Sequence, residues 1–103
     1  MSAADESALR RAIVGTALEM ERLGINQGTS GNVSARYRAG LLITPSGVSA
    51  RELDEKDIVW LPLDIADDAE LLRIERPSSE WRIHRDILCA RDDIDAVVHK
   101  TST

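Results

Sequence analysis

Side chains that could do chemistry gather in three short segments rich in glycine, serine and threonine. They are residues 28–32 (GTSGN), 44–47 (TPSG) and 77–80 (PSSE). Glycine lets backbone N–H groups turn toward a ligand, and successive N–H groups with nearby hydroxyls form a concavity that binds anions. The same residue types also build ordinary turns. The segments therefore predict either three unrelated turns or, if they meet in space, a phosphate site without lysine or arginine.

Glu80 follows two serines at the point where a helix is expected to begin. An acidic residue in the first helical turn complements the helix dipole, which gives Glu80 a structural interpretation. A carboxylate beside a bound phosphate would instead suit a general acid and base. Both interpretations stay open from the residues alone.

The two histidines raise the question of a metal site. His99 ends the apolar run AVVH, where a histidine is either a strand-end residue or a ligand. His84 shares a helix face with Ile87 and Leu88, which favours a structural role. Two histidines and one carboxylate form the ligand set of some catalytic zinc sites. The sequence does not show whether His84 approaches His99.

The elements that position these residues follow from hydrophobic periodicity. Apolar residues at three- and four-residue spacing predict a helix over residues 3–23, with Gly24 just past its end. The later elements predicted are strands over 33–37, 41–44, 58–63, 71–74 and 96–99, a helical turn over 53–56 and a helix over 79–91. This order predicts one α/β or α+β domain over residues 1–103.

Composition excludes several classes of protein. A net charge of −5 over 103 residues argues against a nucleic-acid-binding protein. Cys89 is the only cysteine, so an internal disulfide is excluded and a reducing compartment is favoured. No apolar run approaches the roughly 18–20 residues of a membrane span, and the first residues do not resemble a signal peptide. A cytoplasmic protein without a membrane partner is the prediction.

Taken together, the segments resemble the class II aldolase/adducin family. The resemblance runs from about residue 9 to residue 99 and rests on LGINQGTSGNVSARY, LLITPSGV, DIVWLPLD, RPSSEWRIHRDIL and DIDAVVH, in this order. It is strongest for sugar-phosphate aldolases of the L-fuculose-phosphate type. It implies a three-layer α/β/α fold with a mostly antiparallel central sheet. It also implies zinc-assisted cleavage of a sugar phosphate to dihydroxyacetone phosphate and an aldehyde, by a homotetramer.

The resemblance further implies roles for individual residues. The phosphate would be bound by Thr29, Gly31, Asn32, Ser46, Gly47, Ser78 and Ser79. Glu80 matches the catalytic acid/base, which also binds zinc when substrate is absent, and His99 matches the first zinc histidine. Related epimerases have aspartate at the position of Glu80, so the glutamate favours an aldolase.

The resemblance ends abruptly after His99. Family members continue with a second histidine two residues later, but here Lys100 and then Thr101 follow. The zinc site is therefore predicted to be incomplete in this chain, which is expected to be the N-terminal portion of the domain. Two hypotheses compete: a sugar-phosphate aldolase, or a non-catalytic remnant that keeps a phosphate-binding site.

Overall fold

The computed structural model describes residues 3–24 and 31–100. The chain forms, in order, α1 (Ala3–Arg22), β1 (Asn32–Tyr37), β2 (Gly40–Ile43), β3 (Val59–Pro62), α2 (Glu70–Glu75), α3 (Trp81–Ala90) and β4 (Ala96–His99). Short 3-10 turns at Ala50–Glu52 and Glu55–Asp57 precede β3. No helix in the described part of the chain is long and apolar enough to cross a membrane.

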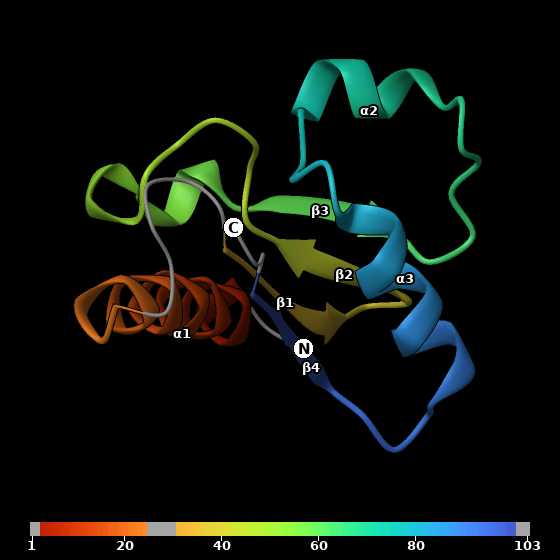
Figure 1. The fold of residues 1–103 in the computed structure, drawn as a ribbon. Coiled ribbons are helices and arrows are strands. Elements are labelled where there is room, and N and C mark those ends of the chain that lie inside the picture. The colour runs from red at the N-terminus through yellow and green to blue at the C-terminus, as the bar shows by residue number, and fades with distance from the viewer. Residues whose placement is uncertain (1–2, 25–30, 101–103) are drawn as a thin grey trace.

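The four strands form one antiparallel sheet in the order β3-β2-β1-β4. Helix α1 packs on one face of this sheet, and α3 with α2 lies on the other (Figure 1). This three-layer α/β/α arrangement with an antiparallel sheet confirms the predicted fold class.

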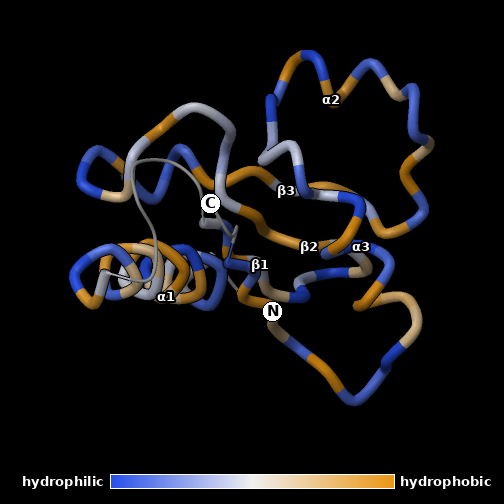
Figure 2. The backbone as a smooth tube through the Cα atoms, viewed as in Figure 1, coloured by the Kyte–Doolittle hydropathy of each residue, from blue (hydrophilic) through white to orange (hydrophobic). Residues whose placement is uncertain are grey.

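Alternation along the strands divides the core in two. Val33, Ala35 and Tyr37 of β1 point toward α1. In β2, Leu42 also faces α1, whereas its neighbours Leu41 and Ile43 face α3. Every residue of β2 is buried, and Figure 2 shows hydrophobic residues running through β2 and β3. Because both faces are covered, the middle of the sheet is a rigid support for the segments at its ends.

The β1–β2 connection depends on a close approach of the backbone. Arg38 and Ala39 form the turn, both with positive φ (47° and 54°), as a tight two-residue hairpin requires. Gly40 then begins β2, and a Cβ there would stand only 2.6 Å from the Trp60 ring. Glycine is therefore required at position 40 by space, and the predicted hairpin at 38–40 is confirmed.

Two short elements differ from prediction. The strand predicted over 71–74 is wrong, because these residues lie in helix α2. Leu71 and Leu72 are consecutive and both pack against the core, whereas Ile74 is 66% exposed. The sequence ELLRIE consists largely of good helix formers, and its local hydrogen bonds need no strand partner. The helical turn predicted over 53–56 is replaced by two 3-10 turns, with residues 53 and 54 between them.

The longer elements follow their predictions closely. Gly24 lies past the end of α1 with φ of 76°, and Pro62 is the last residue of the edge strand β3. Helix α3 begins at Trp81 instead of residue 79.

Strand β4 lies at the other edge of the sheet. Among the described residues its one strand neighbour is β1, and Val98 is 54% exposed. The Arg36 guanidinium of β1 donates to the carbonyl oxygens of Leu88, Arg91 and Ile94 at 2.8, 3.0 and 2.8 Å. One side chain thus joins the sheet to the end of α3 and to the turn that leads into β4.

Candidate functional site

Thr44 links segment 77–80 to Val33, the residue that follows segment 28–32. The Thr44 N–H donates to the Val33 carbonyl oxygen (3.1 Å), and the Thr44 hydroxyl accepts from the Val33 N–H (3.3 Å). On its other side, the Thr44 carbonyl oxygen accepts from the Ser78 N–H at 2.9 Å. Pro45 and Pro77 form an isolated antiparallel bridge beside it. Segments 44–47 and 77–80 therefore lie side by side, next to the start of β1, where segment 28–32 ends.

Within segment 44–47, Ser46 and Gly47 differ in whether their surroundings leave them free to contact a ligand. The N–H and the hydroxyl of Ser46 both donate to the Arg76 carbonyl oxygen, at 3.0 and 3.3 Å. A ligand at Ser46 would have to compete for these donors. Gly47 has a φ of 75°, a left-handed conformation that favours glycine, and open space on its Cβ side. A pocket of about 470 Å³ opens beside this turn, with Lys56 and Arg76 in its wall.

Segment 77–80 leads into α3. Ser78 is buried, and its hydroxyl oxygen accepts from the Glu80 N–H at 3.2 Å. Ser79 is exposed. Glu80 is the N-cap residue of α3, yet its half-buried carboxylate makes no capping hydrogen bond. The helix therefore does not use this carboxylate as a cap, and both interpretations of Glu80 remain compatible with the geometry.

Asn32, Ser34 and His84 form a buried polar cluster behind these turns. Asn32 and Ser34 lie on the same face of β1, and the fully buried His84 comes from α3. Its Nδ1 lies 2.6 Å from the Ser34 hydroxyl, and its Nε2 bonds the Asn32 amide oxygen. Burial, together with the nearby His99, lowers the pKa of His84 from its ordinary 6.5 to about 4. His84 is therefore neutral at physiological pH, because a buried imidazole loses the hydration that would stabilise its charged form.

His99 lies next to this cluster but has a different environment. It pairs with Asn32 across the β1–β4 ladder, and its ring centroid is 6.3 Å from that of His84. Its Nδ1 is buried and has no hydrogen-bond partner within residues 3–24 and 31–100. His99 thus has an unused nitrogen, whereas both nitrogens of His84 are engaged.

The described residues do not assemble a complete metal site. No group of three or more histidine, cysteine, aspartate or glutamate residues able to hold a metal is found among them. His84 does not complete a set with His99 and Glu80, because its ring nitrogens already bond Asn32 and Ser34. Thr29 and Thr101 lie outside the described residues, so the structure does not test the phosphate role of Thr29.

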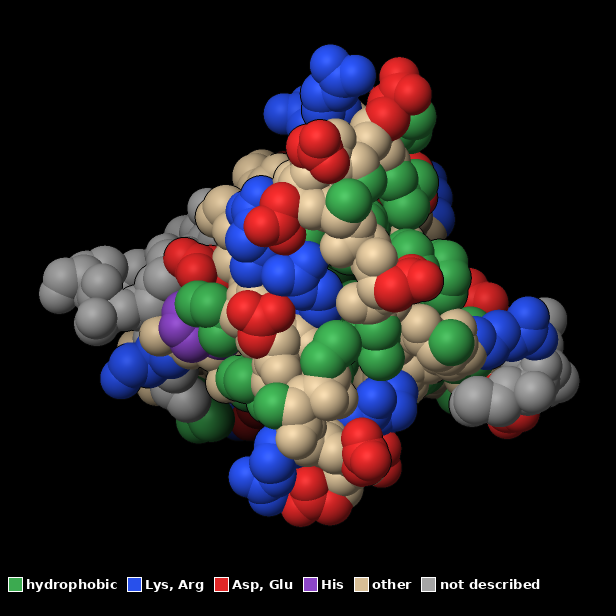
Figure 3. All heavy atoms as spheres, turned by 90° about the vertical axis from the view of Figure 1, so that its right-hand side faces the viewer, with side chains coloured by type: hydrophobic (Ala, Val, Ile, Leu, Met, Phe, Trp, Pro, Cys, Tyr) green, Lys and Arg blue, Asp and Glu red, His purple; other side chains and the backbone are tan. Residues whose placement is uncertain are grey.

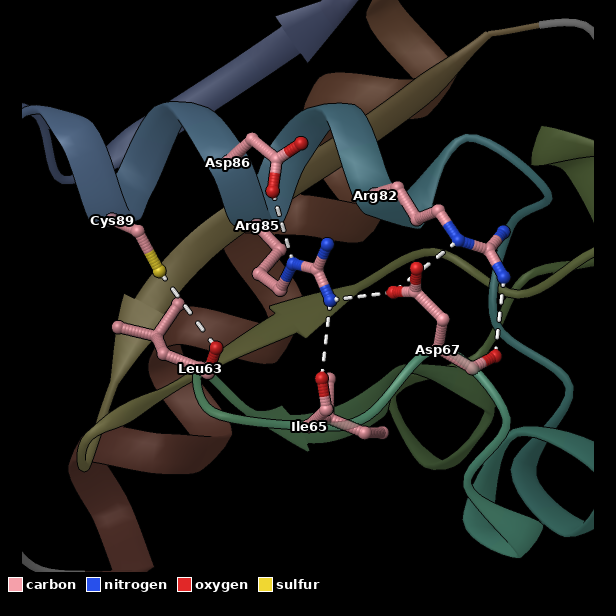
Figure 4. A network of polar contacts seen from close by, with 7 residues as sticks. All are labelled: Leu63, Ile65, Asp67, Arg82, Arg85, Asp86 and Cys89. Carbon is pink, nitrogen blue, oxygen red and sulfur yellow. Dashed lines mark hydrogen bonds and ion pairs between the residues drawn. The ribbon is translucent and has the colours of Figure 1, made fainter.

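Arginine side chains on the outer face of α3 anchor this helix, which carries His84 and follows Glu80. Figure 4 shows Arg85 between Asp67 and Asp86, with Nη1 3.0 Å from the Asp67 carboxylate and 3.1 Å from the Ile65 carbonyl oxygen. Arg82 also reaches Asp67. Figure 3 shows acidic and basic side chains interspersed over this side of the molecule. This agrees with the mixed charges of the sequence and shows no one-sign patch on that face.

Sequence reasoning missed the bonds from His84 to Asn32 and Ser34. The polar residues at alternate positions of β1 were a signal, because Asn32 and Ser34 had to share a face. Asn32 and Ser34 need hydrogen-bond partners only if this face is buried. The burial depends on the packing of α3 on the sheet, which the sequence alone does not show.

Comparison with known proteins gives a consistent result. Residues 11–103 match the family described as Class II Aldolase and Adducin N-terminal domain. The chain is 48% identical over 92 residues to a 5-methylthioribulose-1-phosphate/5-deoxyribulose-1-phosphate aldolase of Rhodospirillum rubrum, covering 89% of this chain and 40% of the relative. It is 46% identical over 95 residues to the L-fuculose phosphate aldolase of Escherichia coli, covering 92% of this chain and 42% of the relative.

Solved structures agree with these relatives. An L-fuculose 1-phosphate aldolase superposes with a TM-score of 0.78 at 30% identity, covering all of this chain and 47% of the other. The L-fuculose-1-phosphate aldolase of Thermus thermophilus gives 0.77 at 28% identity, with 92% and 47% covered. The chain thus spans about 40% of the length of the curated relatives it matches. By its sequence, its motifs and its fold, the chain belongs to the class II aldolase and adducin family.

Proposed function

We propose that this chain contributes the phosphate-binding turns and the acid–base carboxylate of a sugar-phosphate aldolase. The reaction would cleave a ketose 1-phosphate, such as L-fuculose 1-phosphate or 5-deoxyribulose 1-phosphate, to dihydroxyacetone phosphate and an aldehyde. The relatives named for these substrates support the class of reaction. The observation that carries the proposal is that Thr44 bonds both Ser78 of the third segment and Val33, which directly follows the first.

The phosphate would bind to N–H and O–H donors at this end of β1. Gly31, Gly47 and Ser79 offer backbone donors, and the serine hydroxyls add further ones. The start of α3 adds the positive end of a helix dipole, which favours an anion. Ser46 would contribute only if a ligand displaced its bonds to the Arg76 carbonyl oxygen. The turns themselves would bind the anion through uncharged groups, beside a pocket wall that also holds Lys56 and Arg76.

Glu80 would serve as the proton-transfer group. It directly follows the two serines proposed to hold the phosphate, so the phosphate would anchor the substrate next to its carboxylate. The carboxylate is half-buried and not engaged as a helix cap, which leaves it able to accept or donate a proton. Cleavage of the carbon–carbon bond requires such a group to move a proton to or from the substrate.

Zinc, which the family resemblance implies, is only partly accommodated by the described residues. His99 offers a buried, unpartnered nitrogen, and Glu80 offers a carboxylate. A catalytic zinc site usually has three protein ligands, and the described residues provide no third. A homotetramer and a cytoplasmic location, both predicted above, stay predictions.

Phosphate binding without catalysis is the second candidate function. It is favoured by the missing third ligand among the described residues. The two candidates share the phosphate site and differ in whether cleavage occurs.

Ligand-dependent unfolding tests the shared site. Inorganic phosphate or dihydroxyacetone phosphate should raise the melting temperature by roughly 6 °C at about ten times Kd, whereas sodium chloride at equal ionic strength should not. Ser79→Ala should weaken this protection. Ser49→Ala, which removes a hydroxyl outside the three segments, is the matched control. No shift with either phosphate ligand up to millimolar concentration would refute the proposed site.

A cleavage assay separates the two candidates. We expect this chain to show no turnover of L-fuculose 1-phosphate, with or without added zinc, because the described residues offer no third zinc ligand. Release of dihydroxyacetone phosphate that depends on zinc and is lost in Glu80→Gln would instead establish the catalytic candidate for this chain itself.

A further inference from the structure

We propose that His84 is a positioning residue that fixes the Asn32 amide so that its NH2 group, and not its oxygen, is offered to the bound phosphate. The proposal rests on the function proposed above, in which Asn32 belongs to the phosphate site. It assigns a role to a histidine that lies in the second polar layer, behind the three turns.

The polarity of the amide follows from the hydrogen bonds of the cluster. The Asn32 oxygen faces Nε2 of His84, and an amide oxygen can only accept. With the amide in this orientation, Nε2 carries the proton. In the neutral ring Nδ1 then has a lone pair, which accepts from the Ser34 hydroxyl 2.6 Å away. The oxygen of Asn32 is thereby engaged, and the other branch of the amide is its NH2 group.

Burial couples the orientation of the amide to the tautomer of the ring. Asn32 is 3% exposed, and Ser34 and His84 are fully buried. A reversed amide would place two hydrogen-bond donors against each other or require the other tautomer of the ring. It would also present a partial negative charge to an anion. The imidazole tautomer and the sign of the charge at the phosphate site are therefore coupled.

The helix and the sheet hold the two partners in register. His84 lies on α3, four residues after Glu80, and Asn32 is the first residue of β1. The bonds of Arg36 to the end of α3 and those of Arg85 to residues 65 and 67 fasten the same helix to the rest of the fold. The ring is thus placed by packing on both sides and does not depend on a ligand.

The first test needs no substitution. A long-range 1H–15N NMR spectrum of the wild-type chain at pH 7 should show His84 as the neutral Nε2–H tautomer. The Nδ1–H tautomer would overturn the proposal, because Nε2 would then accept from the Asn32 NH2 group and the amide oxygen would face the phosphate.

The second test measures the affinity for inorganic phosphate by titration. His84→Leu should weaken binding about tenfold or more, whereas His84→Gln, which can donate to Asn32 and accept from Ser34, should stay within about threefold of wild type. Leu88→Val, one turn further along the same buried face, is the control for general loosening of α3 and should leave the affinity unchanged.

The outcomes distinguish this inference from the proposed function. Phosphate binding by the wild type that persists unchanged in His84→Leu overturns the positioning role alone. Equal losses in His84→Leu and Leu88→Val also overturn it, because they would reflect loosening of the helix. Absence of phosphate binding in the wild type refutes the proposed function and this inference with it. If His84→Leu does not fold, the tautomer and the His84→Gln affinity still decide the question.

Discussion

Helix α3 is joined to the rest of the fold by a different kind of polar contact on each of its two faces. On the inner face, His84 is fully buried and bonds Asn32 and Ser34 through both ring nitrogens. On the outer face, Arg82 and Arg85 meet Asp67 in a region that water reaches, with the Asp67 side chain 64% exposed. Both contacts join residues distant in the sequence. They differ in how much the loss of one partner costs, because water replaces a missing partner only on the outer face.

The largest effect is expected from emptying the inner face. His84→Leu removes the imidazole and leaves the Asn32 oxygen and the Ser34 hydroxyl buried without it. We expect the free energy of unfolding to fall by about 3 kcal/mol, since an unsatisfied buried polar group costs about 1–3 kcal/mol. Urea unfolding followed by tryptophan fluorescence would measure this. His84→Gln should lose less than half as much, and equal losses would show that volume matters here more than hydrogen bonding.

An intermediate effect is expected from pH. The pKa of His84 is lowered from 6.5 to about 4 in the folded chain. Between these two pH values the unfolded chain binds a proton at this imidazole, and the folded chain does not. The contribution of neutral His84 to the free energy of unfolding is therefore fully present above pH 6.5 and is lost as the pH falls toward 4. Between about pH 7.5 and 5.5 the loss should be about 1.4 kcal/mol. Urea unfolding at the two pH values checks this, and His84→Gln should remove that part of the difference.

The smallest effect is expected on the outer face. Asp67→Ala removes the carboxylate partner of Arg85 and Arg82, but the pairs are exposed at Asp67, so we expect a loss of about 0.5 kcal/mol. This loss should shrink further in about 1 M salt, whereas that of His84→Leu should not, because salt screens exposed charges and not buried neutral bonds. A loss above about 2 kcal/mol for Asp67→Ala would contradict the comparison of the two faces.

Much of the fold was predictable because its elements have local signatures. The period of apolar residues identified α1 and α3, and a short apolar run identified β4. The β1–β2 hairpin followed from two short strands around a small-residue turn. Segment 71–74 was predicted wrongly, because a short run with two leucines and an isoleucine has no clear period. There the choice of helix over strand depends on which side chains the core can accept.

The candidate site was predictable in part. The glycine, serine and threonine segments, and Glu80 and His99, stand out by residue type and order, and their assignment to a phosphate or metal site stays a prediction. Which N–H and O–H groups of these turns are free to bind a ligand was not predictable. That Ser46 donates twice to the Arg76 carbonyl oxygen depends on a neighbour 30 residues away.

The sequence by itself determined the family, the strands that alternate, and the residue types gathered in the three turns, because these properties are written in residue order and short-range period. The tertiary structure alone decided that segments 44–47 and 77–80 meet at Thr44, that His84 has no free nitrogen and that His99 has one. These outcomes depend on contacts between residues 11 to 52 positions apart, and no local pattern encodes which buried polar groups become partners.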